Sequence, residues 1–450
     1  MTNRKSKTNP LEWQQDGLSR RNFVSAGLVA GFVGIAGSTG AKSAPLIRPD
    51  TSTTELATDE AFWHAVAANY DVTDKITNLE NGYWGIMATP VLQEYQRLSA
   101  WVNRENTNFA RWNLGDTYVK LREQVAGFLN VGADEIAFTR GATEALQALI
   151  GGYNRLSPGD IVLYADLDYS EMKTAMRWLA DRRSVVPVKV NFPEPTKDKP
   201  LTEQDILSFY EQSLDANPKT KLLLLTHLNN WTGLIIPVAK ITAMAKSRGV
   251  DTVLDAAHSV GHVDFDIKEL GCDFVGVNLH KWIGAPLGCG VIYINKDRIE
   301  DIDVYMAKSP GSKKITARID TGTVNMAAHM AIPKALDFHD QVGTANKEAR
   351  LRYLRNIWVD KAREMKGLTV LTPDDPHMVA GLTSFRLDGV VTTEANNVVM
   401  KRLATEFGIL TTRRTGPAAG DCIRVTPSFY NSPDDMLKLV NALAKITSET

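Results

Sequence analysis

A lysine that directly follows an apolar, strand-like run constrains this chain more than any other feature. Residues 274–279 form that run, His280 and Lys281 follow it, and after a glycine-rich loop residues 290–294 form a second apolar run. An ammonium group at the end of a buried strand must be paired with an anion or lose its proton. A lysine amine without its extra proton is a nucleophile that condenses with aldehydes. A lone lysine in such a place more often just reaches solvent, so the interpretation depends on the rest of the chain.

The composition is that of a globular enzyme. A length of 450 residues favours two or three domains, and 44% hydrophobic with 23% charged residues is ordinary for such proteins. The formal net charge is −1, and no basic run suggests a nucleic-acid partner. Cys272, Cys289 and Cys422 lack metal-ligand spacing, and their odd number argues against a disulfide framework. We therefore expect neither a bound metal nor nucleic acid.

The N-terminus resembles a twin-arginine export signal. Arg20 and Arg21 precede residues 24–41, which carry no charged side chain. This run is too short, and too rich in glycine and alanine, for a membrane span. Small residues near Ser43 suit a signal peptidase. We predict a signal over residues 1–43, the twin-arginine export machinery as a partner, and a mature periplasmic protein that stays at the membrane if the signal is retained.

Apolar runs that alternate with helical patterns predict an α/β fold. Such continuous apolar strands are typical of a mostly parallel sheet with helices on both faces. We predict a large domain over residues 86–318 with a seven-stranded sheet, an N-terminal arm over residues 44–85, and a smaller α+β C-terminal domain over residues 319–450. The predicted strands cover residues 135–139, 161–166, 185–190, 221–225, 252–254, 274–279 and 290–294.

Two glycine-containing segments predict close approach of the backbone to a ligand. In the arm, Gly82 and Gly85 allow such an approach or a tight turn. Later, a short strand ends at Gly141 and a helix begins at once with Ala142 and Thr143. Free backbone N–H groups at a helix start bind phosphate without a basic residue, although an ordinary helix cap gives the same pattern.

Polar residues follow three of the predicted strands. Asn230 follows one strand, Asp255 and His258 follow the next, and His280 with Lys281 follow the third. Ligands of open α/β sheets bind at the carboxyl ends of strands, so we expect these side chains to converge opposite the anion site. A lysine, a buried aspartate and a phosphate cradle are the parts that pyridoxal 5′-phosphate (PLP) requires.

Each of these residues has a distinct chemical role in that interpretation. Lys281 forms the Schiff base and later moves protons at the substrate Cα, and Asp255 keeps the pyridine nitrogen protonated. Asn230 and His258 hydrogen-bond the phenolic oxygen, and Tyr169 lies on the ring face. In isolation, Asp255 as a helix cap and His258 as a core histidine would be more common.

Six short strings resemble the fold-type I PLP-dependent enzymes of the aminotransferase class V family, over about residues 60–448. The Asp-x-x-His form and the Thr-Gly-Thr turn are most similar to the isopenicillin N epimerase-like branch. The matching strings are residues 139–144, 227–230, 255–258, 280–281, 321–323 and 423–431.

The resemblance implies specific contacts. Thr323 reaches the phosphate of a neighbouring subunit, which implies a homodimer with shared active sites. Arg424 clamps the substrate carboxylate in a bidentate pair, and Asn81 is a second substrate contact. Asn278 stands where relatives often carry a serine or threonine near the phosphate. The implied cofactor contacts are Ala142, Thr143, Tyr169, Asn230, Asp255, His258, Asn278, His280, Lys281 and Thr323.

The implied activity is PLP-dependent chemistry at the Cα of an amino-acid or peptide-like substrate, with Lys281 and Asp255 as catalytic residues. Epimerisation and transamination both remain open, and tailoring of a pyoverdine-type siderophore is a variant of either. Cysteine desulfurases resemble the chain around residues 414–416, but no cysteine follows at residues 417–421, which disfavours a persulfide mechanism.

The sequence also argues against two other classes of protein, a non-catalytic binding protein and a nucleotide-binding protein. A non-catalytic binding protein of this fold would have lost Lys281 or Asp255, and a nucleotide-binding protein would carry a P-loop lysine that residues 141–143 lack. Side-chain recognition is predicted near Tyr83, Arg111, Trp231 and Arg413.

Overall fold

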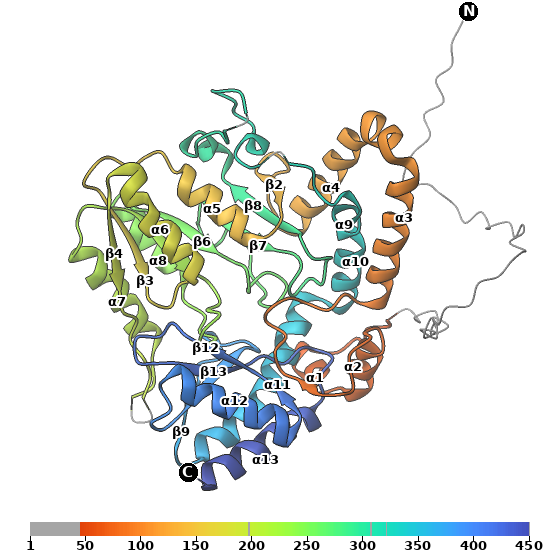
Figure 1. Ribbon diagram of the computed structural model, residues 1–450, viewed down its shortest axis with the longest axis vertical. Helices are drawn as coiled ribbons and strands as arrows, with labels where there is room; N and C mark the ends of the chain where they lie inside the picture. Colours follow the sequence, from red (N-terminus) through yellow and green to blue (C-terminus); the bar gives the residue numbers. More distant parts are fainter. Residues whose placement is uncertain (1–45, 197–198, 307, 321, 450) are drawn as a thin grey trace, which may run out of the picture.

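The computed structural model describes residues 46–449 apart from 197–198, 307 and 321, and the predicted export signal at residues 1–43 lies outside them (Figure 1). Within this described part, no helix is long and apolar enough to cross a membrane. The same residues contain no group of three or more His, Cys, Asp or Glu side chains that could hold a metal ion.

A seven-stranded sheet with the order β2-β8-β7-β6-β5-β3-β4 forms the centre of the larger part of the described chain. Strand β8 runs antiparallel to both of its neighbours, and the other neighbouring pairs are parallel. The predicted mostly parallel sheet of seven strands is confirmed. The strands are β2 (Ile136–Thr139), β3 (Ile161–Ala165), β4 (Val186–Val190), β5 (Thr220–Thr226), β6 (Asp251–Asp255), β7 (Phe274–Asn278) and β8 (Gly290–Ile294).

Alternate side chains of the strands face two helical layers. On β5, Leu222 and Leu224 pack in one core cluster with helices α5 and α6, whereas Leu223 and Leu225 pack in another with α7 and α8. Successive side chains of a strand point to opposite faces, so a continuous apolar strand needs cover on both. The covering helices are α5 (Ala142–Gly152), α6 (Ser170–Arg183), α7 (Glu203–Asp215) and α8 (Val238–Ser247).

Helices from before and after the sheet complete the larger core. Buried residues of the long helical pair α3 and α4 and of α10 belong to the same cluster as β2 and β8 (Figure 1). Helices α9 and α10 meet at Ala331, where Pro333 suits the first turn of a new helix because proline has no N–H to donate. These elements are α3 (Thr89–Trp112), α4 (Leu114–Phe128), η1 (Lys296–Asp301), η2 (Ile315–Ala317), α9 (Met326–Met330) and α10 (Ile332–Val342).

The C-terminal part forms a smaller α+β unit, as predicted. Its antiparallel sheet has the order β12-β13-β10-β9 and packs with three helices around a core that includes Trp358 and Phe385. The predicted domain boundaries after residues 85 and 318 stay predictions. The elements are α11 (Thr344–Glu364), β9 (Leu368–Val370), β10 (Thr383–Leu387), α12 (Thr393–Phe407), β12 (Thr412–Arg414), β13 (Cys422–Val425) and α13 (Pro433–Glu449).

The N-terminal segment joins the two units. Helices α1 (Thr53–Ala57) and α2 (Glu60–Ala67) lie beside α11 in Figure 1, and strand β1 (Thr77–Asn78) pairs with β11 (Ile409–Leu410) of the smaller unit. After β1 the chain passes over the carboxyl ends of the central strands before α3 begins. Residues 79–85, the last part of the predicted N-terminal arm, make this passage, and from here on the arm means these seven residues.

Candidate active site

Three adjacent parallel strands end at the same edge of the large sheet. Thr226 at the end of β5 pairs with Asp255 at the end of β6, and Asp255 pairs in turn with Gly276 of β7. The polar residues that follow these strands therefore lie together, as the strand order required. Lys281, Asp255 and His258 lie together at this edge, and we call their surroundings the crevice.

The Lys281 amine lies 2.9 Å from His258 Nε2. Removal of the amine from water lowers its pKa to about 7, the nearby Asp255 carboxylate opposes this shift, and the positive charges of Arg424 and Arg414 reinforce it. The amine is thus uncharged for much of the time at neutral pH. That state is the one a nucleophile or a proton acceptor needs.

His258 and Asp255 are both buried beside the lysine. Burial lowers the pKa of His258 well below its ordinary value, so the imidazole is neutral, and its Nδ1 has no hydrogen-bond partner among the described residues. Burial raises the pKa of Asp255, whose carboxylate accepts a hydrogen bond from Ala257 N at 2.9 Å. A buried nitrogen without a partner and a desolvated carboxylate both suit a polar aromatic ligand between them.

The predicted anion site lies at the start of α5. Ala142 N donates a 2.7 Å hydrogen bond to Asn278 Oδ1, so this side chain caps the helix, while Thr143 is exposed. The turn is tightly packed, because a Cβ atom on Gly290 would lie 2.4 Å from Gly141 Cα. A phosphate would thus share the helix start with Asn278, and its contacts with Ala142, Thr143 and Asn278 stay predictions.

His280, Tyr169 and Asn230, three further predicted cofactor residues, each have protein contacts or burial of their own. His280 Nδ1 lies 2.9 Å from Cys289 O, a contact that closes the loop after Lys281. Tyr169 is partly buried at the start of α6, and burial raises its pKa to about 12. Asn230 is buried, and its backbone oxygen accepts a hydrogen bond from Arg424. Their roles towards a cofactor stay predictions.

The arm passes directly over the lysine. Gly85 N donates a 2.9 Å hydrogen bond to His280 O, and a Cβ atom on Gly85 would lie 1.8 Å from Lys281 O. A Cβ atom on Gly82 would lie 2.6 Å from Arg424 Nη2. Both glycines therefore lie closely packed against protein atoms of the site, and their predicted approach to a ligand stays a prediction.

Asn81 fixes the arm from within. Its side-chain nitrogen donates to Thr426 O at 3.0 Å and to Asn78 O at 3.1 Å, and its oxygen accepts a hydrogen bond from the Tyr430 hydroxyl. Since these contacts engage both ends of the side-chain amide, a substrate contact by Asn81 stays a prediction.

Sequence reasoning missed two charged residues at the crevice, Glu80 and Arg414. Arg424 is buried and donates to both carboxylate oxygens of Glu80, at 2.6 and 2.8 Å, and Arg414 donates to the same carboxylate at 3.1 Å. Glu80 could have been found from the sequence, because it is an acidic residue within the glycine-containing arm. Arg413 was predicted near the substrate instead, but it pairs with Asp421 at 2.9 Å on the other face of β12.

The remaining predicted residues are exposed or have other contacts. Trp231 is buried and donates from Nε1 to Asp168 O at 3.3 Å, and Tyr83 and Arg111 are exposed. Thr323 is exposed on the described chain, and its predicted contact with a neighbouring subunit stays a prediction.

The cysteines offer no reactive thiol. Cys272, Cys289 and Cys422 are all buried and unbridged. Burial raises the pKa of Cys289 and Cys422 to about 12 and raises that of Cys272 as well. Thiolates are the nucleophilic form, so these side chains are inert at neutral pH.

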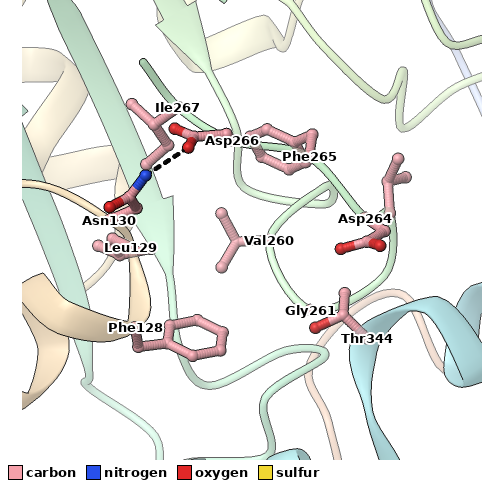
Figure 2. Close-up of a pocket in the computed structure, with 11 residues that line it drawn as sticks. Phe128, Leu129, Asn130, Val260, Gly261, Asp264, Phe265, Asp266, Ile267 and Thr344 are labelled. Atoms are coloured by element: carbon pink, nitrogen blue, oxygen red, sulfur yellow. Dashed lines mark hydrogen bonds between the residues drawn. The ribbon is translucent and has the colours of Figure 1, made fainter. Parts of the chain in front are cut away.

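A cavity of about 140 Å³ lies elsewhere in the larger unit (Figure 2). Its wall combines apolar side chains such as Phe128 and Ile267 with Asp264 and Asp266, and Asn130 donates a hydrogen bond to Asp266. No predicted site residue lines it. The cavity therefore gives no alternative position for the chemistry of Lys281.

Comparison with known proteins gives matches over most of the chain. The family model described as aminotransferase class-V matches residues 88–436. Isopenicillin N epimerase of Streptomyces clavuligerus is 26% identical over 408 residues, which cover 86% of this chain and 99% of that protein. A probable cysteine desulfurase of Halalkalibacterium halodurans is 27% identical over 314 residues, which cover 66% of this chain and 74% of that protein.

Solved structures share the fold. A cysteine desulfurase of Escherichia coli superimposes with a TM-score of 0.72 at 22% identity, covering 86% of this chain and 98% of that one. A mutant of the cystine C–S lyase C-DES, with glycine covalently linked to its PLP cofactor, gives a TM-score of 0.70 at 23% identity, covering 82% and 97%.

Proposed function

Because the chain belongs to the class V aminotransferase family and is a PLP-dependent enzyme, we propose that it acts at the Cα of an amino-acid or peptide-like substrate. The observation that carries this proposal is the contact between the Lys281 amine and His258 beside the buried Asp255. A lysine with a pKa of about 7 is suited to accept and return a proton near neutral pH.

The residues of the crevice fit the cofactor. When bound, PLP supplies an electron-withdrawing ring that stabilises negative charge at the substrate Cα. Lys281 would provide the amine that holds the aldehyde carbon and would take the Cα proton. Asp255 would accept a hydrogen bond from the ring nitrogen and favour its protonated form. The start of α5 at Thr143 would bind the phosphate.

Epimerisation and transamination are the two outcomes that this arrangement supports. Both require Lys281 to remove the Cα proton, and they differ in where the proton returns. The isopenicillin N epimerase relatives favour the first, and a siderophore-tailoring PLP enzyme or a transaminase is the alternative. Desulfuration is disfavoured despite the desulfurase relatives, because Cys422 is buried on β13 with a pKa of about 12.

A hydrogen-exchange screen tests the proposal. Holoenzyme is incubated in D₂O with amino acids and peptide-like siderophore precursors, and Cα deuterium, inversion and keto-acid formation are followed by NMR. We expect Cα exchange by the wild type and a loss of about 10³-fold in Lys281→Ala, since a positioned base contributes on that scale. The variant Lys281→Arg, which keeps the positive charge, should be equally impaired. Equal exchange in all three proteins would refute the role of Lys281.

We also propose export and dimer formation. The sequence pair Arg20–Arg21 supports a periplasmic location, and replacing both with lysine in a reporter fusion of residues 1–45 should stop transport.

The exposed position of Thr323 is compatible with a contact across a subunit interface. Sedimentation of the holoenzyme should give the mass of two chains; a monomer at micromolar concentration would contradict the shared site.

A further inference from the structure

Lys347 is a second buried lysine, and the proposed chemistry does not use it. It lies at the start of α11, and only 1% of the residue is exposed. Burial lowers the pKa of its amine to about 7, and the negative charge of Asp340 opposes this shift without forming an ion pair with it. A buried amine without a paired carboxylate is costly, so we expect its N–H groups to have a specific use.

The amine of Lys347 has two hydrogen-bonding partners. It lies 2.7 Å from His339 Nδ1 and donates to Trp282 O at 3.3 Å. Burial keeps the His339 ring neutral by lowering its pKa, and Nε2 lies 2.7 Å from Thr344 Oγ1. A neutral ring that donates from Nε2 to the threonine has Nδ1 free to accept from the amine. His339 thus fixes the direction of the amine, and a further N–H group is left for Trp282 O.

The backbone around Lys281 is held by hydrogen bonds from three parts of the chain. Just before it, His280 O accepts a hydrogen bond from Gly85 N of the arm at 2.9 Å. Lys281 O accepts one from Gly284 N, within the same loop, at 3.2 Å. The carbonyl of the next residue accepts its hydrogen bond from Lys347. Helix α11 of the smaller unit therefore takes part in holding this loop.

Trp282 has no other donor for its carbonyl oxygen. Among the described residues, only Lys347 donates to Trp282 O. The residue is 3% exposed, and its ring centroid lies 3.9 Å from that of His262. The next residue, Ile283, is packed so closely that a Cβ atom on Gly261 would lie 2.6 Å from its Cδ1. Without the lysine, a buried carbonyl beside Lys281 would lose its hydrogen bond, which is unfavourable.

We propose that Lys347 is a positioning residue for Lys281: its hydrogen bond to Trp282 O holds the loop and so keeps the Lys281 amine buried beside His258. The inference rests on the proposed function, because it concerns the lysine which that function uses. Lys347 acts through the backbone and takes no proton from the substrate. An apolar side chain of the same length would fill the same space but would not hold the loop.

Lys347→Met in the holoenzyme tests this role, because methionine has a similar length and no donor. The reporters are the Gly284 and Ala285 amides, which donate to Lys281 O and Leu279 O. Their hydrogen exchange, measured by mass spectrometry, should become about tenfold faster when the loop loosens. Lys347→Gln keeps an N–H donor without the positive charge and should restore most of the protection. Equal exchange in the methionine and glutamine variants would refute the role of the hydrogen bond.

The pH profile of PLP uptake separates positioning from a purely structural role. Its midpoint reports the Lys281 amine, whose pKa burial lowers to about 7. In Lys347→Met this amine gains access to water, so the midpoint should rise by about one pH unit. Lys361→Met is the matched control on the same helix and should leave loop exchange and midpoint unchanged, because Lys361 is exposed and pairs with Glu364.

A measurement on the wild type needs no variant and decides the matter if Lys347→Met does not fold. With ¹⁵N in the lysine side chains, the Lys347 amine should exchange slowly with water and show through-space contacts to His339 and Trp282 in NMR spectra. A freely exchanging amine would overturn the assignment. If the wild type takes up no PLP, the proposed function fails, whereas a loaded Lys347→Met with wild-type loop exchange and midpoint refutes this inference alone.

Discussion

At the scale of the residue, burial sets the chemistry of the site. Lys281 and His258 lie 2.9 Å apart, and removal from water favours the neutral form of both. Had both kept their positive charges, the two would repel each other. The same burial raises the pKa of Asp255, so a positively charged partner such as a protonated ring nitrogen stabilises its ionised form.

The pH dependence of cofactor uptake follows from the Lys281 pKa. That pKa is lowered to about 7, so the uncharged amine is the minor form below pH 7 and the major form above it. Uptake of PLP by apoprotein should therefore be about tenfold faster at pH 8 than at pH 6, as followed by stopped-flow absorbance. The control is the reaction of PLP with Nα-acetyl-lysine in solution, whose side-chain amine is free. Its rate should keep rising to far higher pH. A protein profile that matches this control would contradict the shifted pKa.

Residue-level prediction succeeded where strand order decides position. Asp255 and Lys281 lie at the ends of adjacent strands, so the alternation of strands and helices in the sequence was enough to predict that they lie close together. The pair of Glu80 and Arg424 joins residues 344 positions apart in two different units, and no local pattern encodes it. The predicted recognition role of Arg413 stays a prediction; the structure pairs its side chain with Asp421, and the alternation on β12 depends on a register that three residues do not reveal.

At the scale of the element, the arm couples the two units through close packing. It forms an isolated bridge between Glu80 and Thr426 of the smaller unit and a hydrogen bond from Gly85 to His280 of the larger one. Short elements of this kind were the part of the fold that the sequence did not reveal. Strands β1, β9, β11 and β12 have two or three residues each, too few for a periodic pattern.

Substitution of an arm glycine should separate packing from backbone freedom. In Gly85→Ala the new Cβ would lie 1.8 Å from Lys281 O. This oxygen belongs to the backbone, so no change of side-chain rotamer can relieve the clash. We expect a loss of about 3 kcal/mol in the free energy of unfolding and faster release of PLP. Urea unfolding and absorbance after gel filtration measure the two effects.

The exposed helical residue Gly127 provides the matched control. A Cβ atom there meets nothing within 4 Å. Gly127→Ala should stabilise the protein by roughly 0.5–1 kcal/mol through helix propensity, with PLP retention unchanged. Equal behaviour of the two variants would show that the arm is not packed on the lysine loop.

At the scale of the whole molecule, the site is assembled from both units. The larger sheet contributes Lys281 and Asp255 at its strand ends, and β13 of the smaller unit contributes Arg424, which donates to Asn230. The fold class could be predicted because each strand is continuously apolar and each connection is helical. How the smaller unit sits on the crevice depends on side-chain contacts between distant segments, so it could not be predicted.

Reductive trapping of the cofactor tests the central claim most directly. Holoenzyme is treated with borohydride, digested, and mapped by mass spectrometry for the lysine that carries the cofactor. Lys347 is a stringent internal comparison, because it is also buried with a pKa of about 7, yet its amine donates to Trp282 O and contacts His339. The account predicts the label on Lys281 alone, with none in Lys281→Ala. A label on Lys347, or wild-type protein that carries no label, would contradict it.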